Sequence, residues 1–116
     1  MLNILDCTLR DGGYYNNWKF DKDIVNNYLR AMEECSVNVV ELGFRFNSSD
    51  SSLGPFGSTT EVFLQTLDLP TNLQYALMIN GKEFILPSEK DIASLINKTF
   101  ISAKKSKISL IRVAIN

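Results

Sequence analysis

The sequence predicts an α/β fold in which four parallel strands are joined by three crossover helices. Four short runs, at 2–8, 37–43, 73–79 and 108–115, are rich in the aliphatic, β-branched and aromatic residues typical of strands. They begin at nearly equal intervals of about 35 residues, and helical periodicity lies between them. This alternation indicates parallel strands, because a parallel pair needs a long crossover connection.

The first connection is predicted to be an amphipathic helix. Asp21 is a suitable N-cap, since its carboxylate can accept hydrogen bonds from the free amides of the first helical turn. The apolar residues that follow fall on one face of the helix. They are Ile24, Val25, Tyr28, Leu29 and Met32.

The second connection carries a weaker helical signal. Ser58 and Glu61 have the spacing of a capping box, and the apolar residues after them would cover one side of a short helix that Pro70 ends. The serine-rich segment 47–60 is long for an α/β connection. It favours either a mobile lid or an anion site built from backbone amides.

The third connection is predicted to be a helix with Ser88 as its N-cap. Its apolar face would consist of Ile92, Leu95, Ile96, Thr99 and Phe100. Three lysines are expected near its end, where cations suit the helix dipole. They are Lys104, Lys105 and Lys107.

The composition excludes several classes of protein. Twelve Lys and Arg residues against thirteen Asp and Glu give a net charge of −1, which argues against a nucleic-acid-binding protein that uses a basic face. No apolar run approaches the roughly 18 residues of a transmembrane helix. The first residues lack the apolar core of a signal peptide. We therefore expect a cytoplasmic protein that binds neither nucleic acid nor membranes.

Histidine is absent, so imidazole is neither a base nor a metal ligand in this chain. Cys7 and Cys35 are too few for a disulfide framework, and they form no C-x-x-C pair. We expect two buried or half-buried thiols.

Charged and amide side chains gather at or after the carboxyl ends of the predicted strands, which is where parallel α/β folds carry their chemistry. The opposite ends carry little charge. We therefore expect a site at this rim. The residues predicted to contribute are Arg10, Asp11, Glu41, Arg45, Asn80, Arg112 and Asn116.

Arg10 and Asp11 are adjacent, and Gly12 and Gly13 follow them, which would let the backbone turn sharply near a ligand. A carboxylate here is a hard oxygen ligand that suits Mg²⁺ or Mn²⁺. The arginine can hold a carboxylate or polarise a carbonyl group. The alternative is a plain salt bridge that closes a turn.

Glu41 and Arg112 each lie inside an apolar run, where a charge needs a partner or a functional reason. Glu41 is expected either to serve the site or to form a structural ion pair with Arg10, Arg45 or Arg112.

Tyr14, Tyr15 and Trp18 form an aromatic group after the first strand. They are predicted either to wall a small-molecule pocket or to pack beneath a loop.

Three stretches resemble a known superfamily. The run Asp6-Cys7-Thr8-Leu9-Arg10-Asp11-Gly12 resembles the D-x-T-L-R-D-G signature of the metal-dependent lyases and aldolases. Their members include 4-hydroxy-2-oxovalerate aldolase, hydroxymethylglutaryl-CoA lyase, and the isopropylmalate and homocitrate synthases. Val40-Glu41-Leu42-Gly43-Phe44 is similar to the segment that ends their second strand, and Leu110-Ile111-Arg112-Val113-Ala114 to one on the fourth strand of the hydroxy-oxovalerate aldolases.

The resemblance implies a TIM barrel with a divalent metal cofactor, Mn²⁺ or Mg²⁺, and cleavage or condensation through a pyruvate-like enolate. Asp11 would be a metal ligand, Arg10 would stabilise the enolate oxyanion, and Glu41 would support the metal or Arg10. We expect the substrate to be bound by Tyr14, Asn80 and Arg112. Tyr14 stands where the hydroxy-oxovalerate aldolases carry a histidine thought to be the base.

A complete barrel takes roughly 250 residues, so residues 1–116 are interpreted as the N-terminal half of an aldolase-like catalytic domain, a partial (β/α)8 TIM barrel. The expected substrates are a 2-oxo acid and an aldehyde or acyl compound. Alone, this half is expected to be inactive, because the family's His-x-His metal ligands are absent. An open half-barrel exposes strand edges, so we expect self-association or completion by a C-terminal half.

Two alternatives remain open. One is a non-catalytic half-barrel that binds a small carboxylate or assembles with a second chain. The other is an unrelated, doubly wound domain of four strands, which the match to the R-D-G motif disfavours.

Overall fold

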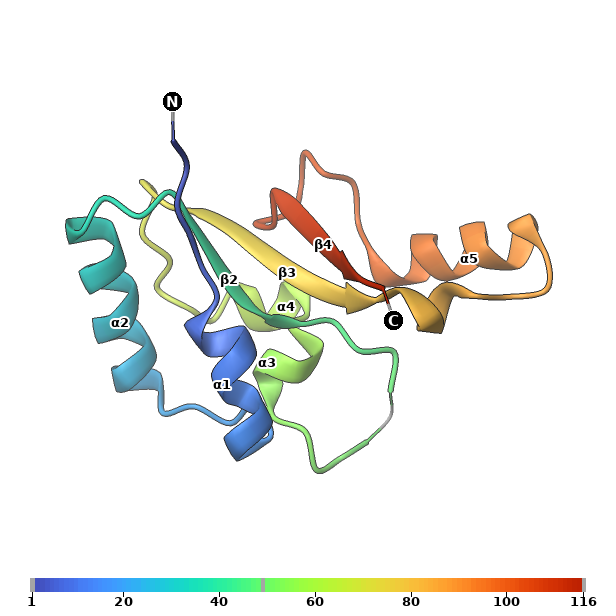
Figure 1. The fold of residues 1–116 in the computed structure, drawn as a ribbon, viewed down its shortest axis with the longest axis horizontal. Helices are drawn as coiled ribbons and strands as arrows, with labels where there is room; N and C mark the ends of the chain where they lie inside the picture. The colour runs from blue at the N-terminus through green and yellow to red at the C-terminus, as the bar shows by residue number, and fades with distance from the viewer. Residues whose placement is uncertain (1, 49, 116) are drawn as a thin grey trace.

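The computed structural model describes residues 2–48 and 50–115. Among these residues, four parallel strands form one sheet in the order β1-β2-β3-β4, with helices in every connection (Figure 1). The strands are β1 (Leu5–Asp6), β2 (Val39–Phe44), β3 (Gln74–Asn80) and β4 (Leu110–Ala114). The predicted α/β fold is confirmed, although β1 is shorter than the predicted run.

The helices are α1 (Thr8–Asn16), α2 (Lys22–Glu34), α3 (Pro55–Ser58), α4 (Glu61–Leu64) and α5 (Glu89–Thr99), with a 3₁₀ helix η1 (Gly81–Phe84). The predicted N-caps of α2 and α5 are confirmed. The Asp21 carboxylate accepts hydrogen bonds from the amides of Asp23 and Ile24, and the Ser88 hydroxyl accepts one from the amide of Asp91. No helix in the described part of the chain is long and apolar enough to cross a bilayer.

Helix α1 replaces the sharp glycine turn that the sequence suggested. Gly12 and Gly13 lie inside this helix, and neither has a positive φ. The physical reason is packing, because a Cβ on Gly13 would come within 1.9 Å of the Trp18 ring. The missing side chain therefore lets Trp18 pack against the helix.

The second connection also differs from its prediction. Thr60, rather than Ser58, caps α4, which ends at Leu64, well before Pro70. The end of the serine-rich segment is packed: Thr59 is buried, and its hydroxyl donates to the carbonyls of Phe44 and Phe56. The predicted segment 47–60 includes Ser49, which lies outside the described residues.

The core lies between the sheet and the helices of the first two connections. Its fully buried side chains include Leu29, Leu42, Leu64 and Leu77. By contrast, α5 has no buried residue. It ends at Thr99, so the three lysines predicted near its end lie beyond the helix.

The outer faces of β4 and α5 are thinly covered. Ile111 and Val113 are exposed, and they line an apolar groove of about 400 Å³ with Ile79, Phe84, Ile96 and Phe100.

Both cysteines are free. Cys7 is half-buried as expected, but Cys35 is exposed, because it caps the C-terminal end of α2 on the surface.

Candidate functional site

The strand register places two of the predicted charged residues on one face of the sheet. Glu41 of β2 is paired with Ala76 of β3, and Arg112 of β4 is paired with Met78. Side chains two positions apart in a strand point to the same face, so Glu41 and Arg112 lie on the same side. Helix α1 follows β1 and brings Arg10 to the carboxylate of Glu41.

Glu41 accepts hydrogen bonds from two arginines, and its side chain is fully buried. Arg10 donates from Nε to Oε1 at 2.8 Å. Arg112 donates from Nε to Oε2 at 2.6 Å and from Nη2 to Oε1 at 2.8 Å. We call Arg10, Glu41 and Arg112 the charged trio.

The trio is ionised at neutral pH. Burial raises the pKa of the Glu41 carboxyl, but the hydrogen bonds from Arg112 and Arg10 outweigh it, so the pKa lies below the ordinary value of 4.5. Burial lowers the pKa of Arg10, but Glu41 raises it by more. The hydrogen bond to Glu41 raises the pKa of Arg112. The trio therefore carries one net positive charge, which suits an anionic ligand.

Asp11 lies beside the trio. Its carboxylate contacts Arg10 Nη1 at 3.2 Å, and 68% of its side chain is exposed. It therefore offers a hard oxygen donor to a cation. No group of three His, Cys, Asp or Glu side chains within residues 2–48 and 50–115 is placed to hold a metal ion. The described chain fits a divalent metal through this one ligand, and the others would have to come from elsewhere.

Aromatic side chains support the trio. The Arg10 guanidinium lies 5.9 Å from the centre of the Phe44 ring. Tyr14 makes edge contacts with Trp18 and Phe44, at centroid distances of 4.9 and 5.9 Å, while Tyr14 stays 60% exposed. Tyr15 points into solvent and does not join this cluster. Sequence reasoning missed Phe44, because its pattern is that of any buried strand residue.

Two further predicted residues lie apart from the trio, and Asn116 lies outside the described residues. Asn80 is the last residue of β3 and is half-buried. Arg45 is buried and turns away: it donates to the backbone carbonyls of Thr59 and Thr99 and contacts Glu61. Burial lowers the pKa of Arg45. Arg45 therefore links β2 to the end of α5.

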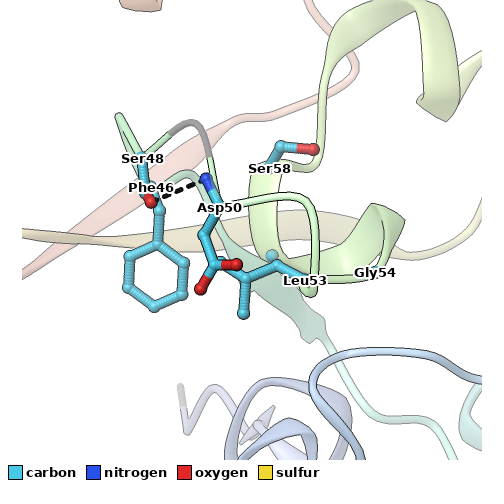
Figure 2. Close-up of a pocket in the computed structure, with 7 residues that line it drawn as sticks. Phe46, Ser48, Asp50, Leu53, Gly54 and Ser58 are labelled. Atoms are coloured by element: carbon cyan, nitrogen blue, oxygen red, sulfur yellow. Dashed lines mark hydrogen bonds between the residues drawn. The ribbon is translucent and has the colours of Figure 1, made fainter.

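A hollow of about 260 Å³ lies beneath the segment that follows β2. Figure 2 shows Phe46, Ser48, Asp50 and Leu53 around it, with the amide of Asp50 donating to the Ser48 hydroxyl at 3.0 Å. No member of the charged trio lines it.

Comparison with known proteins gives one informative match. No family model and no curated protein matches the chain. Among solved structures, it matches one described as "Crystal structure of the N-terminal domain of a putative aldolase from Bacteroides vulgatus", with a TM-score of 0.76 and 36% sequence identity. The fold is an aldolase-like half-barrel. The match covers 98% of this chain and 36% of that chain, so the half-barrel spans about a third of its neighbour's length.

Proposed function

We propose that this half-barrel is the N-terminal part of a divalent-metal-dependent aldolase or lyase that acts on a 2-oxo acid. The observation that carries the proposal is the charged trio, in which Arg10 of α1 and Arg112 of β4 converge on the buried Glu41 of β2, with Asp11 beside it. The fold match to an aldolase N-terminal domain supports aldolase-like character in general. We further propose 4-hydroxy-2-oxovalerate-like substrates, which would yield a pyruvate enolate and an aldehyde.

Arg10 would stabilise the charge that forms during cleavage. In the cleavage of a 4-hydroxy-2-oxo acid, a base takes the proton of the C4 hydroxyl, whose oxygen forms the aldehyde carbonyl as the bond between C3 and C4 breaks. The electron pair of that bond moves into an enolate, and negative charge gathers on the C2 oxygen. A guanidinium fixed by a buried carboxylate is a preorganised partner for that charge. Nε and Nη1 of Arg10 are occupied by Glu41 and Asp11. Nη2 would meet the oxyanion.

Asp11 would supply one ligand to a Mg²⁺ or Mn²⁺ ion, which when bound would polarise the carbonyl group of the substrate. Tyr14 stands one helical turn after Arg10. With Asn80, it would contact the substrate.

Exchange of the pyruvate methyl protons with D₂O, followed by NMR, tests this function in the complete gene product. We expect exchange that requires Mg²⁺ or Mn²⁺, that Asp11→Asn abolishes, and that the control Asp68→Asn retains. Asp68 is an exposed carboxylate outside the site. Exchange that survives Asp11→Asn would contradict the metal assignment.

The presence of one metal donor among the described residues favours a second candidate, a non-catalytic module that binds a small carboxylate. Titration with pyruvate in the presence of EDTA distinguishes the two. Binding that persists without metal, together with no proton exchange under any metal condition, would support the binding module.

A further inference from the structure

The two arginines of the charged trio hold Glu41 in different ways. Arg112 meets both carboxylate oxygens, through Nε at 2.6 Å and Nη2 at 2.8 Å, so it fixes the plane of the carboxylate. Arg10 meets Oε1 alone, through Nε at 2.8 Å. A single contact leaves the carboxylate free to rotate about its last bond. The position of Oε1 is therefore set by Arg112.

Within the described residues, the hydrogen bonds to the Glu41 carboxylate come from Arg10 and Arg112. Ala76, its register partner on β3, offers only a methyl group. A buried carboxylate that loses a hydrogen-bond donor must find another donor, or the fold loses stability because the carboxylate oxygen is left without a hydrogen bond. If Arg112 is removed, the Glu41 carboxylate is free to rotate about its last bond, so Oε1 no longer stays in line with Nε of Arg10.

The other contacts of Arg10 are weaker. The Asp11 carboxylate is 3.2 Å from Nη1, but it is largely exposed, so water and salt screen the attraction. The Phe44 ring supports one face of the guanidinium without fixing its rotation. The buried oxygen of Glu41 is therefore the main constraint on the direction in which Arg10 points.

We propose that Arg112 is a positioning residue, which acts through Glu41 to hold the guanidinium of Arg10 in a fixed orientation. This differs from the sequence prediction that Arg112 binds the substrate. Nε and Nη2 of Arg112 are already committed to Glu41, which leaves Nη1 for any ligand. The catalytic consequence rests on the proposed function, whereas the orientation of Arg10 can be measured without it.

The first test follows the Nε–H signal of Arg10 in ¹H–¹⁵N spectra of the complete gene product, assigned by its loss in Arg10→Lys. In the native protein this proton is bonded to a buried carboxylate, so it exchanges slowly with solvent. We expect Arg112→Met to speed its exchange at least about tenfold, because the orientation of Glu41 is released. Arg112→Gln, which keeps a donor but loses the bidentate pair, should give an intermediate increase.

Arg30→Met is the matched control, since Arg30 is an exposed arginine on α2. It should leave the Arg10 signal unchanged. Glu41→Gln gives the upper limit for the exchange rate of the Arg10 Nε proton, because it removes the ionised acceptor itself. Exchange of the Arg10 proton within about twofold of native in folded Arg112→Met or Arg112→Gln would overturn the proposal, because Arg10 would then be held without Arg112.

The second test measures turnover. A loosened Arg10 should lower kcat by about 10- to 100-fold in Arg112→Met, with KM for the 2-oxo acid changed less than about threefold. In a variant that already carries Arg10→Lys, Arg112→Met should lower kcat by less than about threefold, because both substitutions act on the guanidinium of Arg10. A raised KM with unchanged kcat would show that Arg112 contacts the substrate instead, and would overturn the proposal.

The two tests distinguish a failure of the proposed function from a failure of the proposed role of Arg112. A native protein without proton exchange or turnover would contradict the proposed function, while the Arg10 signal would still decide the role of Arg112.

Discussion

The indole Nε1 of Trp18 donates a hydrogen bond to the backbone carbonyl of Arg10 at 2.9 Å. Trp18 follows α1 in a left-handed conformation, with φ of 57°, which is unfavourable for a bulky residue. The chain folds back there, so that the buried indole lies against the helix it has just left. The hydrogen bond from Trp18 therefore holds the backbone of the helical turn that carries Arg10.

Trp18→Phe should destabilise the protein by about 1 kcal/mol beyond the lost ring contacts, because the hydrogen bond to Arg10 disappears while an aromatic ring remains. Trp18→Ala should cost about 3–5 kcal/mol, since it also leaves a cavity. Urea unfolding measures both values. Equal losses of stability in the two variants would show that packing of the aromatic ring adds nothing to the stability beyond the hydrogen bond.

Gly13→Ala should destabilise the protein although alanine is the better helix former. A Cβ at Gly13 would come within 1.9 Å of the Trp18 ring, so overpacking should cost about 1–3 kcal/mol. Gly12→Ala is the matched control, because its Cβ would meet only the Phe20 ring at 3.8 Å. That change should stabilise the protein by about 0.5–1 kcal/mol. The opposite ranking in thermal unfolding would contradict the packing of Trp18 on α1.

Stability should fall in acid through Glu41. Its pKa in the folded protein lies below the ordinary 4.5, so its ionised form stabilises the fold above that pH. The contribution is lost as pH falls through the folded pKa, at about 1.4 kcal/mol for each pH unit by which the pKa is depressed. Urea titrations between pH 7 and pH 3 should show a steeper loss in the native protein than in Glu41→Gln.

Some acid dependence should survive in Glu41→Gln. Burial raises the pKa of Asp6, but hydrogen bonds from Tyr28 and Thr8 lower it by more, so Asp6 also stabilises the fold in its ionised form. Identical pH profiles for the native protein and Glu41→Gln would contradict the assigned role of Glu41.

Arg45→Met should loosen α5 selectively. The Arg45 guanidinium donates to the carbonyls of Thr59 and Thr99, and no residue of α5 is buried. Losing these charge-assisted bonds should cost about 2–4 kcal/mol. Hydrogen exchange should show faster opening of α5 than of α2, whose residues Val25 and Leu29 are buried. Uniform acceleration in both helices would argue against this link.

The sequence predicted those features that depend on neighbouring residues. The caps at Asp21 and Ser88 need only a side-chain oxygen and the amides of the next turn, so spacing alone identifies them. Helix α1 was missed because Gly12 and Gly13 favour a turn locally. The contact that makes them helical involves Trp18, which packs against Gly13 only once the chain has reversed.

The sequence narrowed the ion-pair partners of Glu41 to three arginines but could not decide among them. Arg10, Arg45 and Arg112 were all open from the sequence. The register places Arg112 on the face of Glu41, whereas an irregularity between Glu41 and Gly43 precedes Arg45, which donates to Thr59. A register shift of one residue exchanges the two faces of a strand, and no local pattern in the sequence reports it.

The order β1-β2-β3-β4 has a consequence for how the chain matures during synthesis. Each strand pairs with its predecessor, so β4 can pair only after β3 has left the ribosome. Glu41 can meet Arg10 early, but Arg112 lies 71 positions after Glu41 and arrives with β4. Before β4 pairs, the Glu41 carboxylate has Arg10 as a partner for Oε1, while Oε2 still lacks the hydrogen bond from Arg112. Completion of the trio therefore has to wait for β4, and a truncation before β4 would leave the carboxylate half satisfied.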